Sequence, residues 1–431
     1  MKFYDIDDAL QEAIEKAEKP VRLKIEIETG MGFFHRIMDQ DIIEANFFGL
    51  KEAAGGTSAR GELLLNNYYG AYSFIDTGAG SQVKISFSLG DTLSYFQRFI
   101  FYIDDKGVQD IKGNGRKKTV YIGLQDLSYK LRRSDEARDW TSPAVFTYSV
   151  VCDKTQPEKS LVHGIAQRAG LNETDIDCST IPVTLPYVQL KHNIWAELSS
   201  LASAYRCHLE CAPEKPLVFA HSPYQSEKLE VRSEEYSHTF YGNEIFYFRK
   251  TESADYYRNT VRLKVNMPVP LEKQEVWQYD DTLGYYIFID GKEIDVIYVD
   301  ELETQDEKIF GRPIILDLNR SCFVRNDEEI DKYGTVALNV TSSYFSEYEI
   351  DGIYHYEDWA KRELADRLQK AREFIVKTHW ALFNARVGAK VKIVLQNEEM
   401  AGTINAFSFR YKRDKAFIAS FRITEEVRSE E

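Results

Sequence analysis

The sequence lacks a long hydrophobic run and lacks the cysteine pattern of a secreted protein. No stretch of about 18 apolar residues occurs in the 431-residue chain, so no membrane-spanning segment is predicted. The charged N-terminal 20 residues have no apolar centre, so we expect no signal peptide and a protein made in a cytoplasm. An odd number of widely spaced cysteines argues against a disulfide framework. They are Cys152, Cys178, Cys207, Cys211 and Cys322, and we interpret them as structural thiols.

Motifs of metal, cofactor and catalytic sites are also missing. Cys207, His208 and Cys211 could form half of a metal site, but no second Cys/His pair has zinc-ligand spacing. The eight histidines show no H-E-x-x-H or H-x-E pattern, and no G-x-S-x-G sequence occurs. Residues 113–119 lack the spacing of a phosphate-binding loop and are typical of a basic hairpin tip. We therefore predict no catalytic, cofactor-binding or metal-binding residues and no enzymatic activity.

Some residues allow a second interpretation. His163 lies among helical apolar residues and is interpreted as a core or boundary residue. A carboxylate pair for glycoside hydrolysis would be recognised only by its spatial separation, and acidic pairs at 280–281 and 398–399 are typical of solvated turns. Six tyrosines could stack on sugars, although such residues more often pack across strands. They are Tyr68, Tyr69, Tyr256, Tyr257, Tyr285 and Tyr286.

The composition is that of a globular protein rich in β-structure. Hydrophobic residues make up 43% of the chain and aromatic residues 13%, which favours strands over helical bundles. The formal net charge of −15 argues against a large phosphate-binding surface. It is compatible with a duct through which DNA passes without binding, because each cation facing the phosphates would add affinity.

Hydrophobic alternation predicts a compact antiparallel sheet, closing toward a barrel, over residues 21–130. Its clearest strands are 21–28, 83–89, 99–103 and 119–124, with a long polar turn at 104–118. A short helix is expected over 6–18. The stretch 57–76 predicts a hairpin, because two asparagines and Gly70 separate an apolar run from an aromatic run.

Residues 150–225 predict a small α+β module. A capping box at Thr155 and Glu158 indicates a helix start, and apolar residues up to Ala169 continue the helix to Gly170. A second helix is expected near 193–206, followed by a hairpin at 208–220. Further on, residues 271–335 are interpreted as irregular, with short strands at 285–289 and 294–299. A long helix over about 357–383 and three strands at 391–395, 404–409 and 417–423 complete the expected elements.

The order of these segments resembles the family of baseplate-hub and tail-tip proteins of tailed phages and prophages. The resemblance rests on short patterns spread along about two-thirds of the chain. They are D-I-x-E-A at 41–45, A-x-G-E-L-x-L-x-N at 59–67, D-L at 126–127, W-x-x-L-x-x-L-A at 195–202, an L-x-F hairpin at 217–219 and V-G-x-x-V-x-I at 387–393. Family members often have an acidic residue where this chain has Ala389.

The resemblance implies an α+β, mainly β fold with two tail-tube-like antiparallel β-barrel domains. These would span residues 1–150 and 226–431, with a small α+β domain at 151–225, an elaboration at about 271–335 and a long helix before the last strands. It further implies a virion structural protein that is made in the bacterial cytoplasm, is assembled into the virion tail and forms a homotrimer on assembly. The hub would join the sixfold tail tube, or a distal tail protein, to a threefold spike or tip, while DNA passes without specific binding. The alternatives are a carbohydrate-binding tail adhesin and a tail-associated cell-wall hydrolase.

Overall fold

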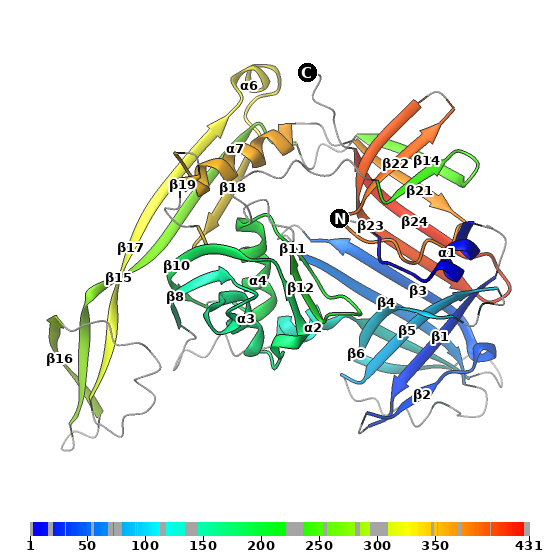
Figure 1. Cartoon of the computed structure of the whole chain (residues 1–431), viewed down its shortest axis with the longest axis horizontal. Coiled ribbons are helices and arrows are strands. Elements are labelled where there is room, and N and C mark those ends of the chain that lie inside the picture. Colours follow the sequence, from blue (N-terminus) through cyan, green and yellow to red (C-terminus); the bar gives the residue numbers. More distant parts are fainter. Residues whose placement is uncertain are drawn as a thin grey trace.

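The protein is an α+β protein in which β-strands predominate (Figure 1). Its computed structural model describes residues 3–15, 20–30, 32–52, 56–67, 72, 80–90, 92, 94–112, 118–133, 145–190, 192–220, 236–252, 257–280, 285–293, 309–345, 349–350, 352–368, 372–396 and 398–425.

The N-terminal strand group follows a short helix and forms much of one sheet. Its strands alternate as predicted: Leu23, Ile25 and Ile27 are buried while the residues between them face outward. The elements are α1 (Asp8–Glu15), β1 (Val21–Glu28), β2 (Phe34–Arg36), η1 (Asp39–Asp41), β3 (Ile42–Lys51), β4 (Gly56–Asn66), β5 (Gln82–Leu89), β6 (Phe96–Lys112) and β7 (Lys118–Gln125).

A middle module follows, in which short helices pack against short strands. Its helices α3 and α4 begin at Ser160 and Asn193, whose side chains accept a hydrogen bond from the third residue of each helix. The elements are α2 (Leu127–Arg133), β8 (Val145–Cys152), η3 (Pro157–Lys159), α3 (Leu161–Gln167), η4 (Glu173–Asp175), β9 (Ile176–Cys178), β10 (Ile181–Gln189), α4 (Ile194–Ala204), β11 (His208–Glu210) and β12 (Leu217–Ala220).

The rest of the chain forms the C-terminal strand group and, between its strands, a long β-arm. The C-terminal strand group consists of β13 (His238–Tyr241), β14 (Ile245–Glu252), β21 (Arg372–Thr378), β22 (Lys390–Leu395), β23 (Glu398–Lys412) and β24 (Ile418–Glu425). The arm and its flanking elements are β15 (Thr260–Asp280), β16 (Tyr285–Glu293), β17 (Ile309–Arg325), α6 (Asp327–Tyr333), β18 (Ala337–Ser342), β19 (Glu349–Ile350), β20 (Ile353–Tyr354) and α7 (His355–Leu368).

The two strand groups share one continuous sheet. Its order is β14-β21-β24-β23-β3-β4-β7-β6-β5-β1-β2, and β3 pairs antiparallel with β23 where the groups meet. The middle module extends the same sheet, because β11 pairs with β4 in parallel. Strands from the two ends of the chain therefore lie side by side at the β3–β23 junction (Figure 1).

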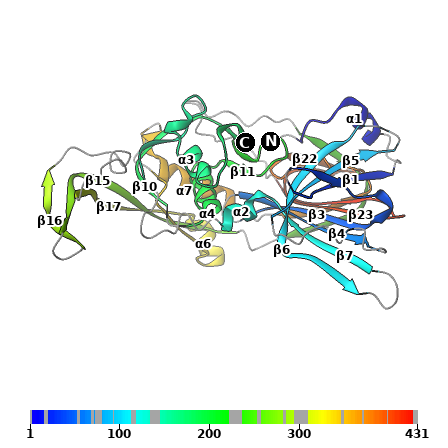
Figure 2. The same cartoon turned by 90° about the horizontal axis from the view of Figure 1, so that it is seen from below.

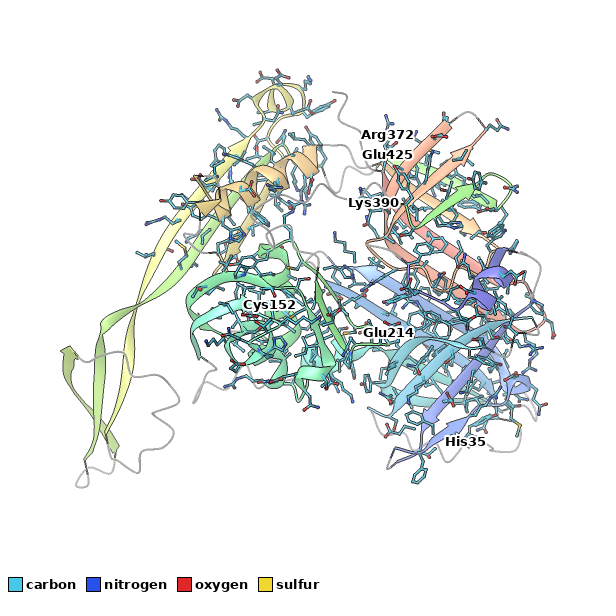
Figure 3. All side chains as sticks on the ribbon, viewed as in Figure 1. His35, Cys152, Glu214, Arg372, Lys390 and Glu425 are labelled. Atoms are coloured by element: carbon cyan, nitrogen blue, oxygen red, sulfur yellow. The ribbon has the colours of Figure 1, made fainter. Side chains whose placement is uncertain are left out.

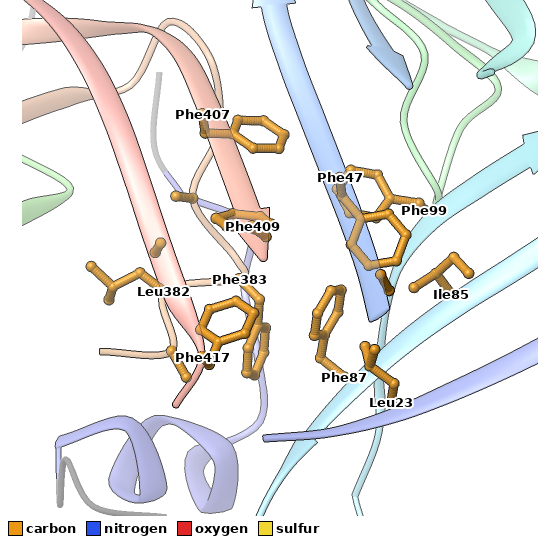
Figure 4. Close-up of a cluster of buried hydrophobic side chains, with 14 of the residues drawn as sticks. Leu23, Phe47, Ile85, Phe87, Phe99, Leu382, Phe383, Phe407, Phe409 and Phe417 are labelled. Atoms are coloured by element: carbon orange, nitrogen blue, oxygen red, sulfur yellow. The ribbon is translucent and has the colours of Figure 1, made fainter. Parts of the chain in front are cut away.

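A single hydrophobic core underlies this sheet and contains residues of both strand groups. Phenylalanines from the N-terminal strand group meet those of the C-terminal strand group across the junction (Figure 4). The rings of Phe87 and Phe383 stack with centroids 5.2 Å apart, and those of Phe99 and Phe407 with centroids 6.1 Å apart. Such stacked aromatic pairs contribute beyond their buried area, so this core holds the two groups together.

A second core belongs to the middle module and the base of the arm. It joins residues of α3, α4 and the β8–β10 strands to Val261, Leu263 and Val265 of β15 and to Trp359 and Leu364 of α7. Residues 257–368 thus pack with the middle module, although they lie inside the segment expected to form a second barrel. The domain boundaries predicted near residues 150 and 225 stay a prediction. The two hydrophobic cores group residues 257–368 with the middle module rather than with the C-terminal strand group.

Two predicted segments are wrong because backbone pairing overrides the local pattern. The expected helix over 357–383 ends at Leu368, and Arg372–Thr378 forms β21 instead. In this strand Phe374, Val376 and Thr378 are buried with period two, and both edges pair, with β14 and with β24. The expected polar turn at 104–118 is mostly strand, since β6 continues to Lys112 opposite β7.

The described parts of the segment 271–335 are also not irregular. Strands β15 and β17 pair from Thr260–Arg325 to Gln278–Ile309 and form an arm that extends away from the rest of the molecule (Figure 2). The predicted strand at 294–299 lies outside the described residues, as does the second half of the hairpin expected at 57–76. The capping box is wrong as well: Thr155 donates to Asp153 and Ser160 caps the helix.

Candidate assembly surfaces

The main strand order of the sheet has two unlike ends. In the described part of the chain, this order ends at β14 on one side and at β2 on the other, and two side branches end at β13 and β9. An unpaired strand edge presents backbone donors and acceptors that can pair with another chain. Because the two edges come from different strands, a contact between them would join two copies of the chain head to tail.

Large apolar side chains are exposed next to both edges. On the β14 side, Phe246 is 49% and Tyr247 39% exposed, and Tyr241 lies just before this strand. On the β2 side, Phe33 is 72% exposed and Met38 follows the strand. Exposed apolar side chains at unpaired edges are typical of surfaces that another protein covers.

The β14 side chains are also held in place by their neighbours. The Phe246 ring stacks on His379 with ring centroids 4.2 Å apart, and the Lys377 ammonium lies 4.8 Å from the centroid of the Tyr247 ring. Aromatic side chains with few remaining rotamers lose little entropy when a partner binds. The aromatic side chains at the β14 edge are therefore preorganised.

The junction of the two strand groups carries an ion pair cluster from the D-I-x-E-A pattern. Glu44 on β3 lies 2.9 Å from Arg410 and 3.6 Å from Lys412, both on β23. Partial burial tends to raise the pKa of the Glu44 carboxyl, but the hydrogen bond and charge of Arg410 give a net lowering. Glu44 of the D-I-x-E-A pattern therefore lies at the β3–β23 junction.

Two other short patterns, at residues 59–67 and 126–127, meet beside this junction. Asp126 of the D-L pattern is buried and accepts hydrogen bonds from the backbone N–H groups of Ala59 and Ser128. Burial raises the pKa of Asp126 to about 7, against the lowering effect of these donors. The segments 59–67 and 126–127 are therefore joined by a buried carboxyl.

A buried charge cluster joins the N-terminus, the middle module and the C-terminal strand group. We name it the Glu210 cluster: Glu210, Tyr4, His208, Arg98 and Arg386. Tyr4 donates its hydroxyl proton to Glu210 over 3.1 Å, His208 lies 2.9 Å from the same carboxylate, and Arg386 is ion-paired with it. Burial of the carboxylate tends to raise the pKa of Glu210, but these partners lower it to about 2.

Arg98 completes the Glu210 cluster from the N-terminal strand group. It is 4% exposed and donates to the backbone carbonyls of Phe383 and Ala385 at 3.0 and 2.9 Å. Its guanidinium also lies 4.5 Å from the centroid of the Tyr4 ring. Sequence analysis missed this cluster, although an arginine within the apolar run 96–103 was a usable signal.

The residues considered for chemistry do not form one site where the structure describes them. Tyr257 is buried and donates to Glu329 over 2.8 Å, so it offers no sugar platform. Tyr68, Tyr69 and Tyr256 lie outside the described residues. Glu399 pairs with Lys392 at 2.7 Å on adjacent strands rather than in a turn.

Three potential metal ligands gather among residues interpreted from the sequence as structural thiols and a core or boundary histidine. His163 is buried as expected, with Nδ1 2.8 Å from the Ser160 hydroxyl. Within the described ranges, the side chains that could share a metal ion are Cys152, His163 and Cys178, not the residues of 207–211.

No helix in the described part of the chain is long and apolar enough to cross a membrane.

The fold is similar to that of phage and prophage tail proteins. A tail protein from Neisseria meningitidis MC58 matches with a TM-score of 0.54 at 10% identity, over 94% of this chain and 97% of its own. The tail protein of prophage MuSo2 from Shewanella oneidensis matches with a TM-score of 0.55 at 12% identity, over 94% and 98%. No family model and no curated protein sequence matches the chain. The recognised fold class, α+β and mainly β, is confirmed by these neighbours.

Proposed function

We propose that the protein is a structural component of a phage or prophage tail, the baseplate or tail-tip hub that links the sixfold tail tube to a threefold tip or spike. The observation that carries the proposal is a fold shared along nearly the whole chain with two tail proteins. Fold similarity at this identity does not by itself assign a function. The arrangement of the strand groups supplies the additional support.

Two strand groups in one chain fit the change of symmetry that such a hub needs. The N-terminal and C-terminal strand groups lie side by side in one sheet and share one core. If each group acts as one tube-like unit, three copies of the chain present six units to a sixfold tube. The same three copies present threefold symmetry to a tip or spike.

The unlike edges of the sheet fit ring closure. A head-to-tail contact between two different surfaces produces a closed ring when the rotation per copy is a whole fraction of a turn. Pairing of the β14 edge with the β2 side of the next copy would satisfy both open edges and cover Phe246 and Phe33. The net charge of −15 would let DNA pass through such a ring with little affinity.

Complementation of tail assembly tests this proposal. The gene is inactivated in the cell that encodes it, and particles are examined by electron microscopy after return of the wild-type or a variant gene. We expect Phe246→Asp to leave tails unassembled, because a charge at the β14 edge opposes its burial between copies. Phe323→Asp, at an equally exposed phenylalanine on the arm, is the matched control and should restore tails.

The imaging also tests the copy number. Averaged images of wild-type tails should place a threefold ring of this chain at the end of the tube. Assembled tails in cells without the gene would overturn the hub function. Cell-wall lysis or sugar binding by the purified chain would support the hydrolase or the adhesin instead.

A further inference from the structure

Three potential metal ligands converge inside the middle module. A thiol of Cys152, a thiol of Cys178 and a ring nitrogen of His163 all lie within 4.8 Å of one another. The side chains come from the end of β8, the end of β9 and the first half of α3. Cys152 lies in the middle of the module in Figure 3. All three residues are at most 4% exposed, so the cluster is shielded from solvent.

This spacing is close to that of a metal site. Sulfur and nitrogen ligands at about 2.3 and 2.0 Å from a tetrahedral zinc ion are separated from one another by roughly 3.5–3.8 Å. Ligand atoms within 4.8 Å reach that geometry by small side-chain rotations. Two thiolates and an imidazole are ligands that zinc prefers, whereas calcium and magnesium prefer oxygen.

The surroundings hold the ligands in place. The Ser160 hydroxyl lies 2.8 Å from His163 Nδ1 and also caps α3, so it fixes the imidazole ring relative to the helix. Ser160 itself forms a bridge to Val150, two residues before Cys152. A ligating histidine is commonly oriented by a partner on its ring in this way.

The charges also fit. Two thiolates and one zinc ion carry no net charge, so the filled site avoids the cost of an unpaired buried charge. Lys154 and Asp177 near the cluster pair with each other at 3.6 Å, so their charges offset.

We propose that Cys152, Cys178 and His163 bind one zinc ion, with a water molecule as fourth ligand, and that the ion fastens β8, α3 and β9 together. The site is structural: it fastens β9, the last strand of the β11–β12–β9 branch of the large sheet, to β8 and α3 of the middle module. It is independent of the hub function, since it needs no partner and no tail assembly.

Cobalt substitution tests the site on the full chain. The reduced, chelator-treated protein is titrated with Co²⁺ and then with Zn²⁺. We expect one equivalent of Co²⁺ to produce sulfur-to-cobalt charge-transfer bands and the strong visible bands of tetrahedral cobalt, and Zn²⁺ to abolish them. Zinc should also raise the thermal unfolding midpoint, because it binds the folded chain in preference to the unfolded one.

Variants then assign the ligands. Cys152→Ser and Cys178→Ser should each weaken zinc binding at least about 100-fold. His163→Cys should retain cobalt binding with more intense charge transfer, since it replaces one zinc ligand by another. Cys322→Ser, a half-buried thiol on the arm, is the matched control and should bind cobalt like the wild type.

Two results would overturn the proposal. The first is the absence of tetrahedral cobalt bands from the folded wild-type chain, a test that needs no variant. The second is a chain isolated with Cys152 and Cys178 joined as a disulfide, seen as a loss of about 2 Da that reductant restores.

Discussion

Buried charged residues in this protein mark the places where distant parts of the chain meet. Glu210 accepts from Tyr4 and pairs with Arg386, which lie 206 and 176 positions away in the sequence. A buried carboxylate costs free energy unless several partners compensate for it. The Glu210 cluster meets this condition, because its partners lower the pKa of Glu210 to about 2 in spite of burial.

We predict that Glu210→Gln destabilises the protein and flattens its acid response. The substitution leaves Arg98 and Arg386 buried without a counter-charge, which should cost about 3–5 kcal/mol at pH 7. The depressed pKa gives wild-type Glu210 a stabilising contribution that is present above about pH 4.5 and is lost as the pH falls toward 2. Urea unfolding at pH 7, 4.5 and 3 measures both effects.

Glu214→Gln provides the control for this prediction. Glu214 lies in the exposed turn after Glu210, and its substitution should change the unfolding free energy by less than about 0.5 kcal/mol. An identical pH dependence in the wild type and in Glu210→Gln would contradict the assigned role of the carboxylate.

Strand β23 is the element on which the continuity of the sheet depends. Its first half, Glu398–Thr403, pairs with β22, and its second half, Ala406–Lys412, pairs with β3. Its pairing with β24 shifts register between Ile404 and Ala406. Such an irregularity bends a strand and increases its twist, which allows β23 to change partners within its length.

We predict that Gly402→Ala disrupts this strand. An added Cβ would collide with the backbone carbonyl of Thr424 on β24, which cannot move without breaking the ladder. We expect a loss of about 2–3 kcal/mol in the free energy of unfolding, similar to other overpacked interiors.

A matched glycine lies on the same side of the molecule. At Gly242 an added Cβ would be in ordinary contact with Leu395, 3.7 Å away, so Gly242→Ala should be nearly neutral in the same denaturation experiment. Equal stabilities of Gly402→Ala and Gly242→Ala would contradict the prediction, because they would show that β24 can move away from β23.

At the scale of the whole molecule, the N-terminal and C-terminal strand groups form one structural body. Strands β1, β3–β7 and β21–β24 bury side chains in the same core, and the pairing of β3 with β23 joins their backbones. Elements that share a core tend to open as a cooperative unit. The arm does not share this core, since its base packs into the second core with the middle module.

We therefore predict one common opening free energy for the two strand groups. In native-state hydrogen exchange, amides of β3, β4, β23 and β24 should exchange through the same global opening with the same denaturant dependence. Amides at the far end of the arm should exchange with a lower free energy, because they pair in a two- or three-stranded ribbon. Separate openings for β3 and β23 would contradict a shared core.

The sequence by itself determined much of the secondary structure and the class of fold. Alternation of apolar and polar residues located β1, β5, β7, β22 and β24, because burial of one face of a strand leaves a local period of two. The order of short motifs led to the family of folds that the structural neighbours confirm. Each strand pattern and each motif is contained in a few neighbouring residues, and only the order of the motifs extends along the chain.

The tertiary structure decided what depends on distant partners. Residues 372–378 have apolar residues at both helical and strand spacing, and pairing with β14 and β24 made them a strand. The β3–β23 junction, the Glu210 cluster and the gathering of Cys152, Cys178 and His163 join residues that no local pattern relates. Backbone hydrogen bonds and side-chain burial between such segments form only in the folded chain, so no single stretch of sequence encodes them.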